Sequence, residues 1–186
     1  LLVSLLSPTN SVLAMIQKLF YGARIERQER PPCVFIIGHW RTGTTFLHEM
    51  LASDPRLVAP KLLQCYCPSH FLISRWFSWF IKLMLPTTRP MDGIEIRLDS
   101  PQEDEFALLL SGQGSPLEMF AYPGERETWA RWFQPSNSNE TTWLATLEQF
   151  LKGVALEYKL SSGLSPQNLL LKSPTHTAKL ALLARQ

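Results

Sequence analysis

The sequence predicts an α/β fold of P-loop-like architecture, in which a parallel sheet is flanked by helices. Two short apolar runs, residues 33–37 and 169–172, are each followed by a loop and then by a helical pattern. Strands buried in a parallel sheet are near-continuous apolar runs, and strand–loop–helix units build α/β domains. Only two such strands are clear, so we expect the sheet to be incomplete within this chain.

Composition and charge narrow the class of protein. The 186 residues are 45% hydrophobic and 18% charged, which is typical of a globular domain with a sizeable core. A net charge of +2 gives no reason to expect nucleic acid as a partner. Cys33, Cys65 and Cys67 form no zinc-binding pattern and the histidines lack metal-site spacing, so we expect no metal. We interpret the cysteines as reduced thiols, which favours a cytoplasmic location.

The N-terminal part is predicted to precede the main domain. Residues 11–20 have the spacing of a short amphipathic helix, with Asn10 as its cap and Gly22 as its stop. The charged segment RIERQERPP then leads to the first strand. We therefore expect residues 1–31 to form an N-terminal helix and connector, and residues 32–186 to form the main domain.

Helices are predicted between and after the two strands. The segment SPQE offers Ser100 as a cap, Pro101 at the first helical position and Glu103 at the capping-box position. A helix should therefore begin at Ser100. The other predicted helices span residues 44–53, 71–85, 125–133 and 142–160, and a last one begins after Lys172.

The apolar segment 71–85 is rich in aromatic residues. It is shorter than the roughly 20 residues that a membrane-spanning helix needs, and two basic residues interrupt it, so we do not expect it to cross a membrane. We expect its aromatic side chains to pack in the core. Two alternatives stay open, in which the segment lines a pocket for an apolar acceptor or rests on a membrane surface. The aromatic residues are Trp76, Phe77, Trp79 and Phe80.

The stretch VFIIGHWRTGTTFLHEML has the form of a phosphate-binding loop without its lysine. In the pattern G-x-x-x-x-G-K-[ST], Gly38 and Gly43 have the right spacing and Thr45 fills the hydroxyl position, but Thr44 replaces the lysine. Arg41 supplies a positive charge inside the loop instead. The glycines could also serve turn geometry alone. Without the lysine, and without a Walker B carboxylate, hydrolysis of a metal-bound triphosphate is not expected.

This loop, GHWRTGTTFLHEML, resembles the 5′-phosphosulfate loop of sulfotransferases, in the branch with arginine in the loop that includes bacterial and tyrosylprotein sulfotransferases. Two further stretches, SPQEDEFALL and LLLKSPTHTAKLALL, are similar and occur in the same order. The resemblance implies 3′-phosphoadenosine 5′-phosphosulfate as co-substrate and transfer of its sulfuryl group, without metal, to a hydroxyl or amine. It implies that the donor is held by Arg41, Thr42, Gly43, Thr44 and Thr45, with Arg41 at the bridging oxygen.

Lys172 is the second predicted catalytic residue. It ends the second strand, and ligands of parallel sheets bind at the carboxyl ends of the strands, so Arg41 and Lys172 should share one rim. The alternative is a solvated lysine at a strand end. The tyrosylprotein branch has a catalytic lysine in a similar place, followed by an acid, where this chain has Ser173.

A base must accept the proton of the acceptor, and Glu103 is our candidate. It lies in the acidic cluster EDE, in which neighbouring carboxylates can raise one another's pKa. Asp104, Glu105 and the loop residue His39 are alternatives. All three acids would also suit the start of a helix without any catalytic role. We expect His48 to be a packing residue, and His176 to be a helix cap or a phosphate contact.

Three functional interpretations remain open. The resemblance implies a further strand that binds the 3′-phosphate, so residues 32–186 are expected to be a sulfotransferase domain truncated before that segment. The alternatives are a P-loop small-molecule kinase and a truncated, non-catalytic nucleotide-binding module. The expected acceptor is a small or lipid-like molecule, with membrane association through residues 71–85 as an option. The sequence predicts no oligomeric state.

Overall fold

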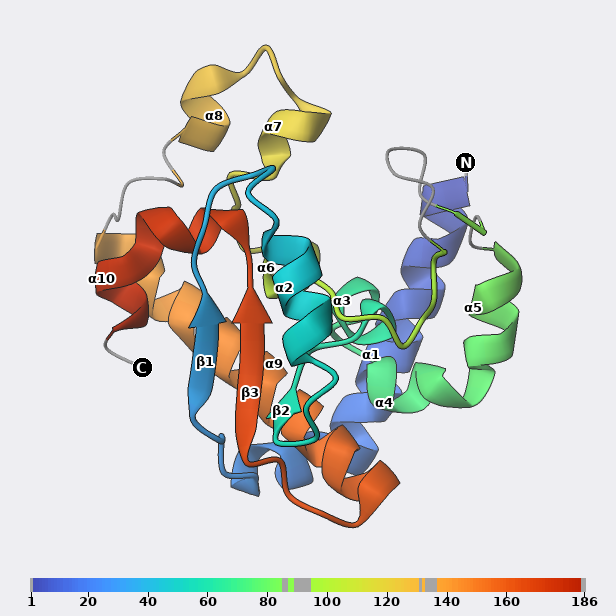
Figure 1. Cartoon of the computed structure of the whole chain (residues 1–186). Helices are drawn as coiled ribbons and strands as arrows, with labels where there is room; N and C mark the ends of the chain where they lie inside the picture. The colour runs from blue at the N-terminus through green and yellow to red at the C-terminus, as the bar shows by residue number, and fades with distance from the viewer. Residues whose placement is uncertain (1, 85–86, 89–94, 131, 133–136, 185–186) are drawn as a thin grey trace.

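A three-stranded parallel sheet lies at one side of the molecule. The computed structural model describes residues 2–84, 87–88, 95–130, 132 and 137–184. The strands are β1 (Cys33–Ile36), β2 (Leu57–Val58) and β3 (Asn168–Lys172), in the order β1-β3-β2 (Figure 1). The predicted α/β class and parallel pairing are confirmed. Strand β2 was not predicted, because two residues carry no recognisable pattern.

The register of the sheet sets the position of the site. Cys33 pairs with Leu169 and Ile36 with Lys172, so β1 and β3 end level with one another. Figure 1 shows both arrows pointing to the end of the sheet where the chain turns into helix α2. The loop after β1 and the residues after β3 therefore start side by side.

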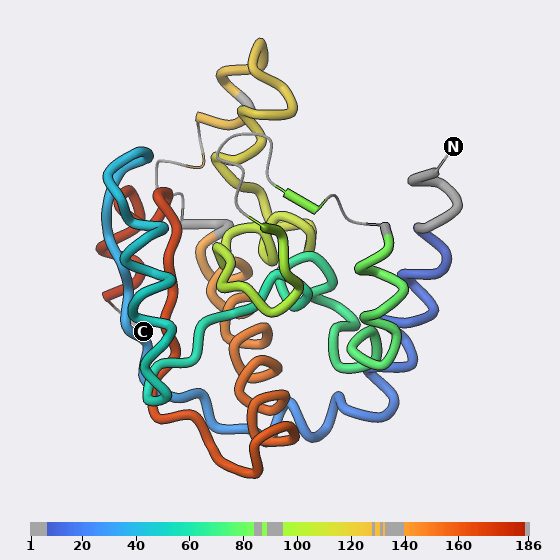
Figure 2. Tube along the Cα trace, turned by 45° about the vertical axis from the view of Figure 1, so that its right-hand side comes forward, coloured from blue at the N-terminus to red at the C-terminus, as the bar shows by residue number. Residues whose placement is uncertain are grey.

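Helices surround the sheet and form most of the core. Helix α2 (Thr44–Leu51) lies against β3, and the long α9 (Asn137–Ser162) crosses the middle of the molecule (Figure 2). Helix α1 (Leu2–Arg27) packs on α9 at the side away from the sheet. Fully buried side chains of α9 and β3 make up the centre of the core, including Leu147, Val154, Leu169 and Leu171.

Shorter elements complete the fold. They are α3 (Leu62–Tyr66), α4 (Phe71–Ser74), the 3₁₀ turn η1 (Arg75–Phe77), α5 (Ser78–Met84), α6 (Asp104–Leu110), α7 (Glu118–Ala121), α8 (Arg126–Ala130), the 3₁₀ turn η3 (Pro174–Lys179) and α10 (Leu180–Leu183). The predicted helices 44–53, 125–133 and 142–160 correspond to α2, α8 and α9 with shifted ends. Residues 85 and 133, at the ends of two predicted helices, lie outside the described residues.

Helix α1 is longer than predicted. It passes through Pro8 and continues beyond Gly22, where the sequence indicated a stop. Contacts with α4 and α9 override these local signals: Ile25 lies in the core, and the Gln17 side chain accepts a hydrogen bond from the Leu72 amide at 2.8 Å.

The helix predicted to begin at Ser100 instead begins at Asp104. The segment before it is extended: Pro101 bridges to Lys61, and the Leu62 amide donates to the Ser100 carbonyl at 2.9 Å. Glu103 is the residue before the helix, yet its side chain makes no capping hydrogen bond. The predicted capping box is therefore wrong, and the Glu103 carboxylate is available for another partner.

The segment 71–85 differs from both its predicted shape and its predicted burial. The single predicted helix is divided into α4, η1 and α5. Phe71 and Leu72 do enter the core, but the four aromatic residues after Arg75 are more than half exposed. Core packing is therefore the wrong explanation for Trp76, Phe77, Trp79 and Phe80.

Candidate active site

The loop between β1 and α2 turns tightly around its backbone. Arg41 has a φ of 66° and Gly43 a φ of 82°, both in the left-handed region, which is unusual for a residue with a side chain such as arginine. A Cβ atom on Gly38 would lie 2.6 Å from the Thr44 Cγ2 atom, so only glycine fits there. The Thr42 hydroxyl donates to the His39 carbonyl at 2.6 Å and closes the loop. This geometry brings the start of α2 close to the end of β1.

Lys172 is buried beside this loop. Its side chain is 4% exposed, and its ammonium donates to the Thr45 hydroxyl at 3.3 Å and to Glu103 Oε1 at 2.5 Å. The alternative of a solvated lysine is therefore wrong. The loop has no lysine at position 44, and a cation from the neighbouring strand contacts its Thr45 hydroxyl instead.

The three consecutive acids at the start of α6 all form ion pairs with β3 and η3. The Glu103 side chain, at the position before the helix, makes no capping hydrogen bond. The basic partners follow one another along β3 and η3 in the same order as the acids. The pairs are Glu103 with Lys172 at 2.5 Å, Asp104 with His176 at 2.9 Å, and Glu105 with Lys179 at 2.9 Å.

Two of these acids are sealed inside the protein. Asp104 and Glu105 are fully buried, whereas the Glu103 side chain is 18% exposed. The Glu105 carboxylate also accepts hydrogen bonds from the Ser115 hydroxyl at 2.7 Å and from the Thr175 hydroxyl at 3.0 Å. Of the three acids, Glu103 alone lines the cavity described next.

A cavity of about 750 Å³ opens beside the loop and Lys172. Its polar end is formed by Arg41, Thr44, Thr45, Glu103 and Lys172. Thr42 and Gly43 belong to the loop but not to the cavity wall. The rest of the wall is mostly apolar and comes from α3, α5, α6, α7 and the segment 95–102. Its apolar residues include Leu62, Leu63, Tyr66, Phe106, Leu117 and Phe120, and Glu95 and Arg97 are its charged ones.

The three histidines considered as candidates differ in their burial and in their partners. His39 is exposed on the loop and lies edge-on to Trp40. His48 is buried in α2, and burial, aided by the nearby Lys172 ammonium, lowers its pKa to about 4, so its imidazole is neutral near pH 7. For His176, burial opposes the charged form, but the Asp104 carboxylate outweighs it and raises the pKa. His176 is thus a buried ion-pair partner rather than a cap, and its hydrogen bond goes to Asp104.

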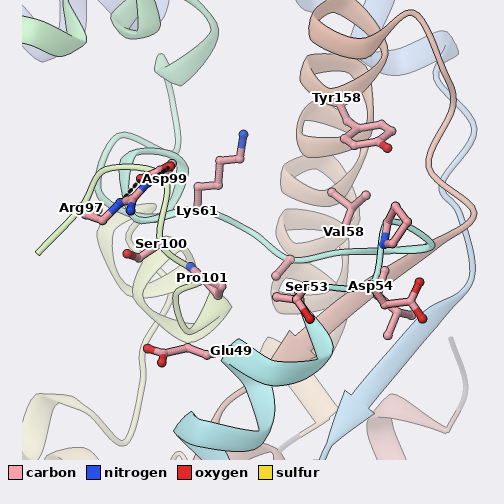
Figure 3. Close-up of a pocket in the computed structure, with 14 residues that line it drawn as sticks. Glu49, Ser53, Asp54, Val58, Lys61, Arg97, Asp99, Ser100, Pro101 and Tyr158 are labelled. Carbon is pink, nitrogen blue, oxygen red and sulfur yellow. Dashed lines mark hydrogen bonds and ion pairs between the residues drawn. The ribbon is translucent and has the colours of Figure 1, made fainter. Parts of the chain in front are cut away.

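A second cavity, of about 610 Å³, lies beyond the C-terminal end of α2 (Figure 3). Its residues include Glu49, Ser53, Lys61 and the exposed ion pair of Arg97 with Asp99 at 2.9 Å. None of the predicted site residues lines this cavity. Phosphate chemistry is therefore better supported at the first cavity, where the glycine loop and the buried cation meet.

Within the described part of the chain, no cluster of three or more His, Cys, Asp or Glu side chains is arranged to hold a metal ion. None of the helices described there combines the length and the apolar character needed to cross a bilayer.

The fold and the site define a protein of the α/β class in which a lysine from an adjacent strand contacts the glycine loop. Residues 32–186 match the model of the sulfotransferase family, and the chain belongs to that family. The resemblance seen in the sequence is confirmed.

Curated relatives and a solved structure agree with this family. The chain is 34% identical over 186 residues to the omega-hydroxy-beta-dihydromenaquinone-9 sulfotransferase Stf3 of Mycobacterium bovis, and equally to that of Mycobacterium tuberculosis. The alignment covers 98% of this chain and 46% of the relative, so the chain spans about half the length of these relatives. The crystal structure of sulfotransferase STF1 from Mycobacterium tuberculosis H37Rv has the same fold, with a TM-score of 0.61 and 16% identity over 93% of this chain and 47% of that one.

Sequence reasoning missed part of the site. It placed Arg41 and Lys172 on one rim, and both line the same cavity. It missed the contact of Lys172 with Thr45 and the apolar wall of the cavity. No local sequence signal reports these features, because they depend on segments that are far apart in the chain.

Proposed function

We propose that the chain carries the 5′ half of a sulfotransferase site that uses 3′-phosphoadenosine 5′-phosphosulfate. The single observation that carries this proposal is the position of Lys172, with its ammonium 3.3 Å from the hydroxyl of Thr45 in the glycine loop. Arg41 lines the same cavity, so two cations and the first turn of α2 face one space. Such a space suits the 5′-phosphosulfate of a donor.

The cations would act on charge that develops during transfer. As the bond between sulfur and the bridging oxygen breaks, negative charge grows on the leaving phosphate. Arg41 and Lys172 would stabilise that charge, and Thr42, Gly43, Thr44 and Thr45 would hold the phosphate. Removing one such preorganised donor typically slows a reaction by about 10²–10³-fold.

Glu103 would be the base. A hydroxyl or amine of the acceptor attacks sulfur in line, its new bond to sulfur forms, and its proton passes to the Glu103 carboxylate. Lys172 and Glu103 are paired at 2.5 Å. In this proposal the ammonium turns to the donor when the donor binds, which leaves the carboxylate free to accept the proton. The burial of Asp104 and Glu105, and the absence of His39 from the cavity wall, favour Glu103 over these alternatives.

The acceptor would be lipid-like. The wall of the 750 Å³ cavity away from the cations is largely apolar, and Tyr66 and Phe106 stack there with ring centroids 5.8 Å apart. An acceptor with one hydroxyl or amine and an apolar body fits such a cavity. The relatives from Mycobacterium are named for a dihydromenaquinone derivative, which belongs to this class.

Calorimetry tests the donor site and separates it from the kinase alternative. Adenosine 3′,5′-bisphosphate, the expected product, is titrated into the chain with and without Mg²⁺, and Mg²⁺–ATP is the comparison ligand. We expect binding of the bisphosphate that does not need Mg²⁺ and is lost in Arg41→Ala. Arg24→Ala, on helix α1, is the control and should bind normally. A protein that takes Mg²⁺–ATP and ignores the bisphosphate would be a kinase rather than a sulfotransferase.

Activity separates the enzyme from a non-catalytic binding module. The bisphosphate would bind to both, so binding alone does not decide between them. Transfer of ³⁵S-sulfate from labelled donor to a long-chain alcohol is therefore measured with the wild-type protein and with Glu103→Gln. Transfer that falls in the variant while bisphosphate binding persists supports the enzyme. Folded protein that binds but never transfers to any hydroxyl or amine supports the module.

A further inference from the structure

A ridge of large apolar side chains projects from the side of the molecule away from the sheet. We define this aromatic ridge as Trp76, Phe77, Trp79, Phe80 and Leu83. Their exposed fractions are 68%, 53%, 66%, 53% and 75%, respectively. Isolated exposed apolar residues are ordinary, but so many within eight positions mark a surface that binds something.

The charges on this segment are all of one sign. Between residues 71 and 84 the charged residues are Arg75 and Lys82, and there is no acid. The Arg75 guanidinium lies over the Trp76 ring, 5.4 Å from its centroid. Tryptophan and phenylalanine beside basic residues are typical of protein surfaces at the boundary between lipid headgroups and acyl chains, where anionic lipids attract the basic side chains.

The ridge is connected to the proposed acceptor cavity by its own helix. Helix α5 lies at the edge of the molecule farthest from the sheet (Figure 1 and Figure 2). Ile81 of this helix lines the 750 Å³ cavity, while its neighbours Trp79 and Phe80 are exposed. One face of α5 therefore belongs to the cavity and another to the surface.

We propose that the aromatic ridge docks on the surface of an anionic lipid bilayer. The benefit of docking rests on the proposed function. On a bilayer surface, a lipid-like acceptor could enter the cavity along α5 without crossing water. The docking itself depends only on the ridge and its two basic residues. A peripheral contact of this kind needs no membrane-spanning segment.

Vesicle binding tests this inference without donor or acceptor. The chain is sedimented with phosphatidylcholine vesicles that contain or lack phosphatidylglycerol. We expect binding to the anionic vesicles that weakens roughly tenfold or more in Trp76→Ser/Trp79→Ser. Arg75→Gln/Lys82→Gln should lose roughly tenfold in affinity for anionic vesicles and little for neutral ones. The matched control is Phe46→Ser/Met50→Ser, which removes two similarly exposed apolar residues from α2 and should bind vesicles normally.

Three outcomes would overturn the inference. The first is no binding to either vesicle by folded protein. The second is equal weakening by the α2 control, which would indicate non-specific adhesion. The third is a concentration-dependent dimer, detected by analytical ultracentrifugation, that dissociates in Trp76→Ser/Trp79→Ser while vesicles are ignored, because the ridge would then bind a second copy of the chain. Failure of the donor titration would leave the vesicle result unchanged, so the two proposals fail separately.

Discussion

The ammonium of Lys172 lies 3.3 Å from the hydroxyl of Thr45, although the two residues are 127 positions apart in the sequence. In a Walker loop, the lysine directly precedes the hydroxyl residue and reaches the phosphates from the same turn. Here the glycine loop has Thr44 at that position, and β3 supplies the cation. The parallel register of β1 and β3 makes this substitution geometrically direct, because Ile36 pairs with Lys172.

Replacement of Lys172 should greatly reduce sulfuryl transfer and should lower the stability of the fold only moderately. Lys172→Met keeps the length of the side chain and removes its charge. We expect transfer to fall by about 10²–10³-fold, because the leaving phosphate loses a fixed cation. We expect a loss of roughly 1–3 kcal/mol in the free energy of unfolding, because Glu103 loses its partner. Transfer assays and urea denaturation measure the two effects.

Matched variants separate charge from general damage. Lys152→Met disrupts the partly exposed pair with Glu148 and should change both quantities little. The double variant Lys172→Met/Glu103→Gln should recover stability without recovering transfer. Normal transfer by Lys172→Met would contradict the catalytic role of the lysine.

A methyl group on Gly38 should disturb the loop. In Gly38→Ala the new Cβ would meet the Thr44 Cγ2 atom at 2.6 Å and the Thr42 Oγ1 atom at 3.2 Å, so the two threonine side chains or the loop backbone must move. We expect bisphosphate affinity to fall by about tenfold or more, since small displacements of binding groups are costly. Calorimetry measures it.

Gly124→Ala is the control for this substitution. No heavy atom lies within 4 Å of the position that its Cβ would occupy, and its φ is not in the left-handed region. Its affinity for the bisphosphate should equal that of the wild type. If Gly38→Ala also bound normally, close packing at Gly38 would not be required for the ligand.

Sequence reasoning succeeded where a local pattern and the fold agree. The runs that became β1 and β3 are apolar and are followed by glycine or serine turns, so their parallel pairing and the shared rim of Arg41 and Lys172 could be predicted. The prediction of a helix start at Ser100 was wrong, although a serine cap, a proline at the first helical position and a glutamate at the capping-box position all indicated one. Pairing of Pro101 with Lys61 extends the chain there, and no local pattern reports that contact.

The prediction that the aromatic residues of segment 71–85 pack in the core was wrong for a different reason. Hydrophobicity shows that Trp76 and Trp79 prefer to avoid water, but not what covers them. A core position and a lipid-facing position have the same sequence signal. The segment is divided into α4, η1 and α5, and the four aromatic side chains after Arg75 are exposed.

Loss of the Glu105 carboxylate should destabilise the region that carries Lys172. Glu105 is fully buried and accepts hydrogen bonds from Ser115, Thr175 and Lys179. Glu105→Ala leaves a buried ammonium unpaired, so we expect a loss of about 3–5 kcal/mol in the free energy of unfolding. Urea denaturation measures it.

Removing the charges of both Glu105 and Lys179 tests whether the loss of stability in Glu105→Ala comes from the unpaired Lys179 ammonium. Glu105→Gln/Lys179→Met keeps hydrogen-bonding atoms near Thr175 and removes both charges of this pair, so most of the stability should return. Asp99→Ala removes one partner of an exposed ion pair and should behave almost as the wild type. A mild effect of Glu105→Ala would show that Lys179 finds water or another partner.

The Asp104–His176 pair should make stability depend on pH. The Asp104 carboxylate raises the pKa of His176, and the same pairing lowers the pKa of Asp104. An unfolded histidine titrates near pH 6.5. The contribution of His176 is therefore complete below about pH 6.5 and is lost as pH rises through its raised native pKa. That of Asp104 is present above its unfolded pKa of 3.8 and is lost as pH falls through its lowered native value.

Comparison of the wild type with His176→Gln separates the pH dependence due to His176 from that due to the other buried histidines. His48 and His70 have lowered pKa values, so they contribute a slope of opposite sign, with stability rising as pH rises toward about 6.5. This slope is common to both proteins and cancels in their difference. We expect the free energy of unfolding to differ most near pH 5–6 and to converge above it, measured by urea denaturation from pH 4 to 9. A difference that is constant with pH would mean that folding does not shift the pKa of His176, and a difference that grows as pH rises toward about 6.5 would mean that His176 is neutral in the folded protein.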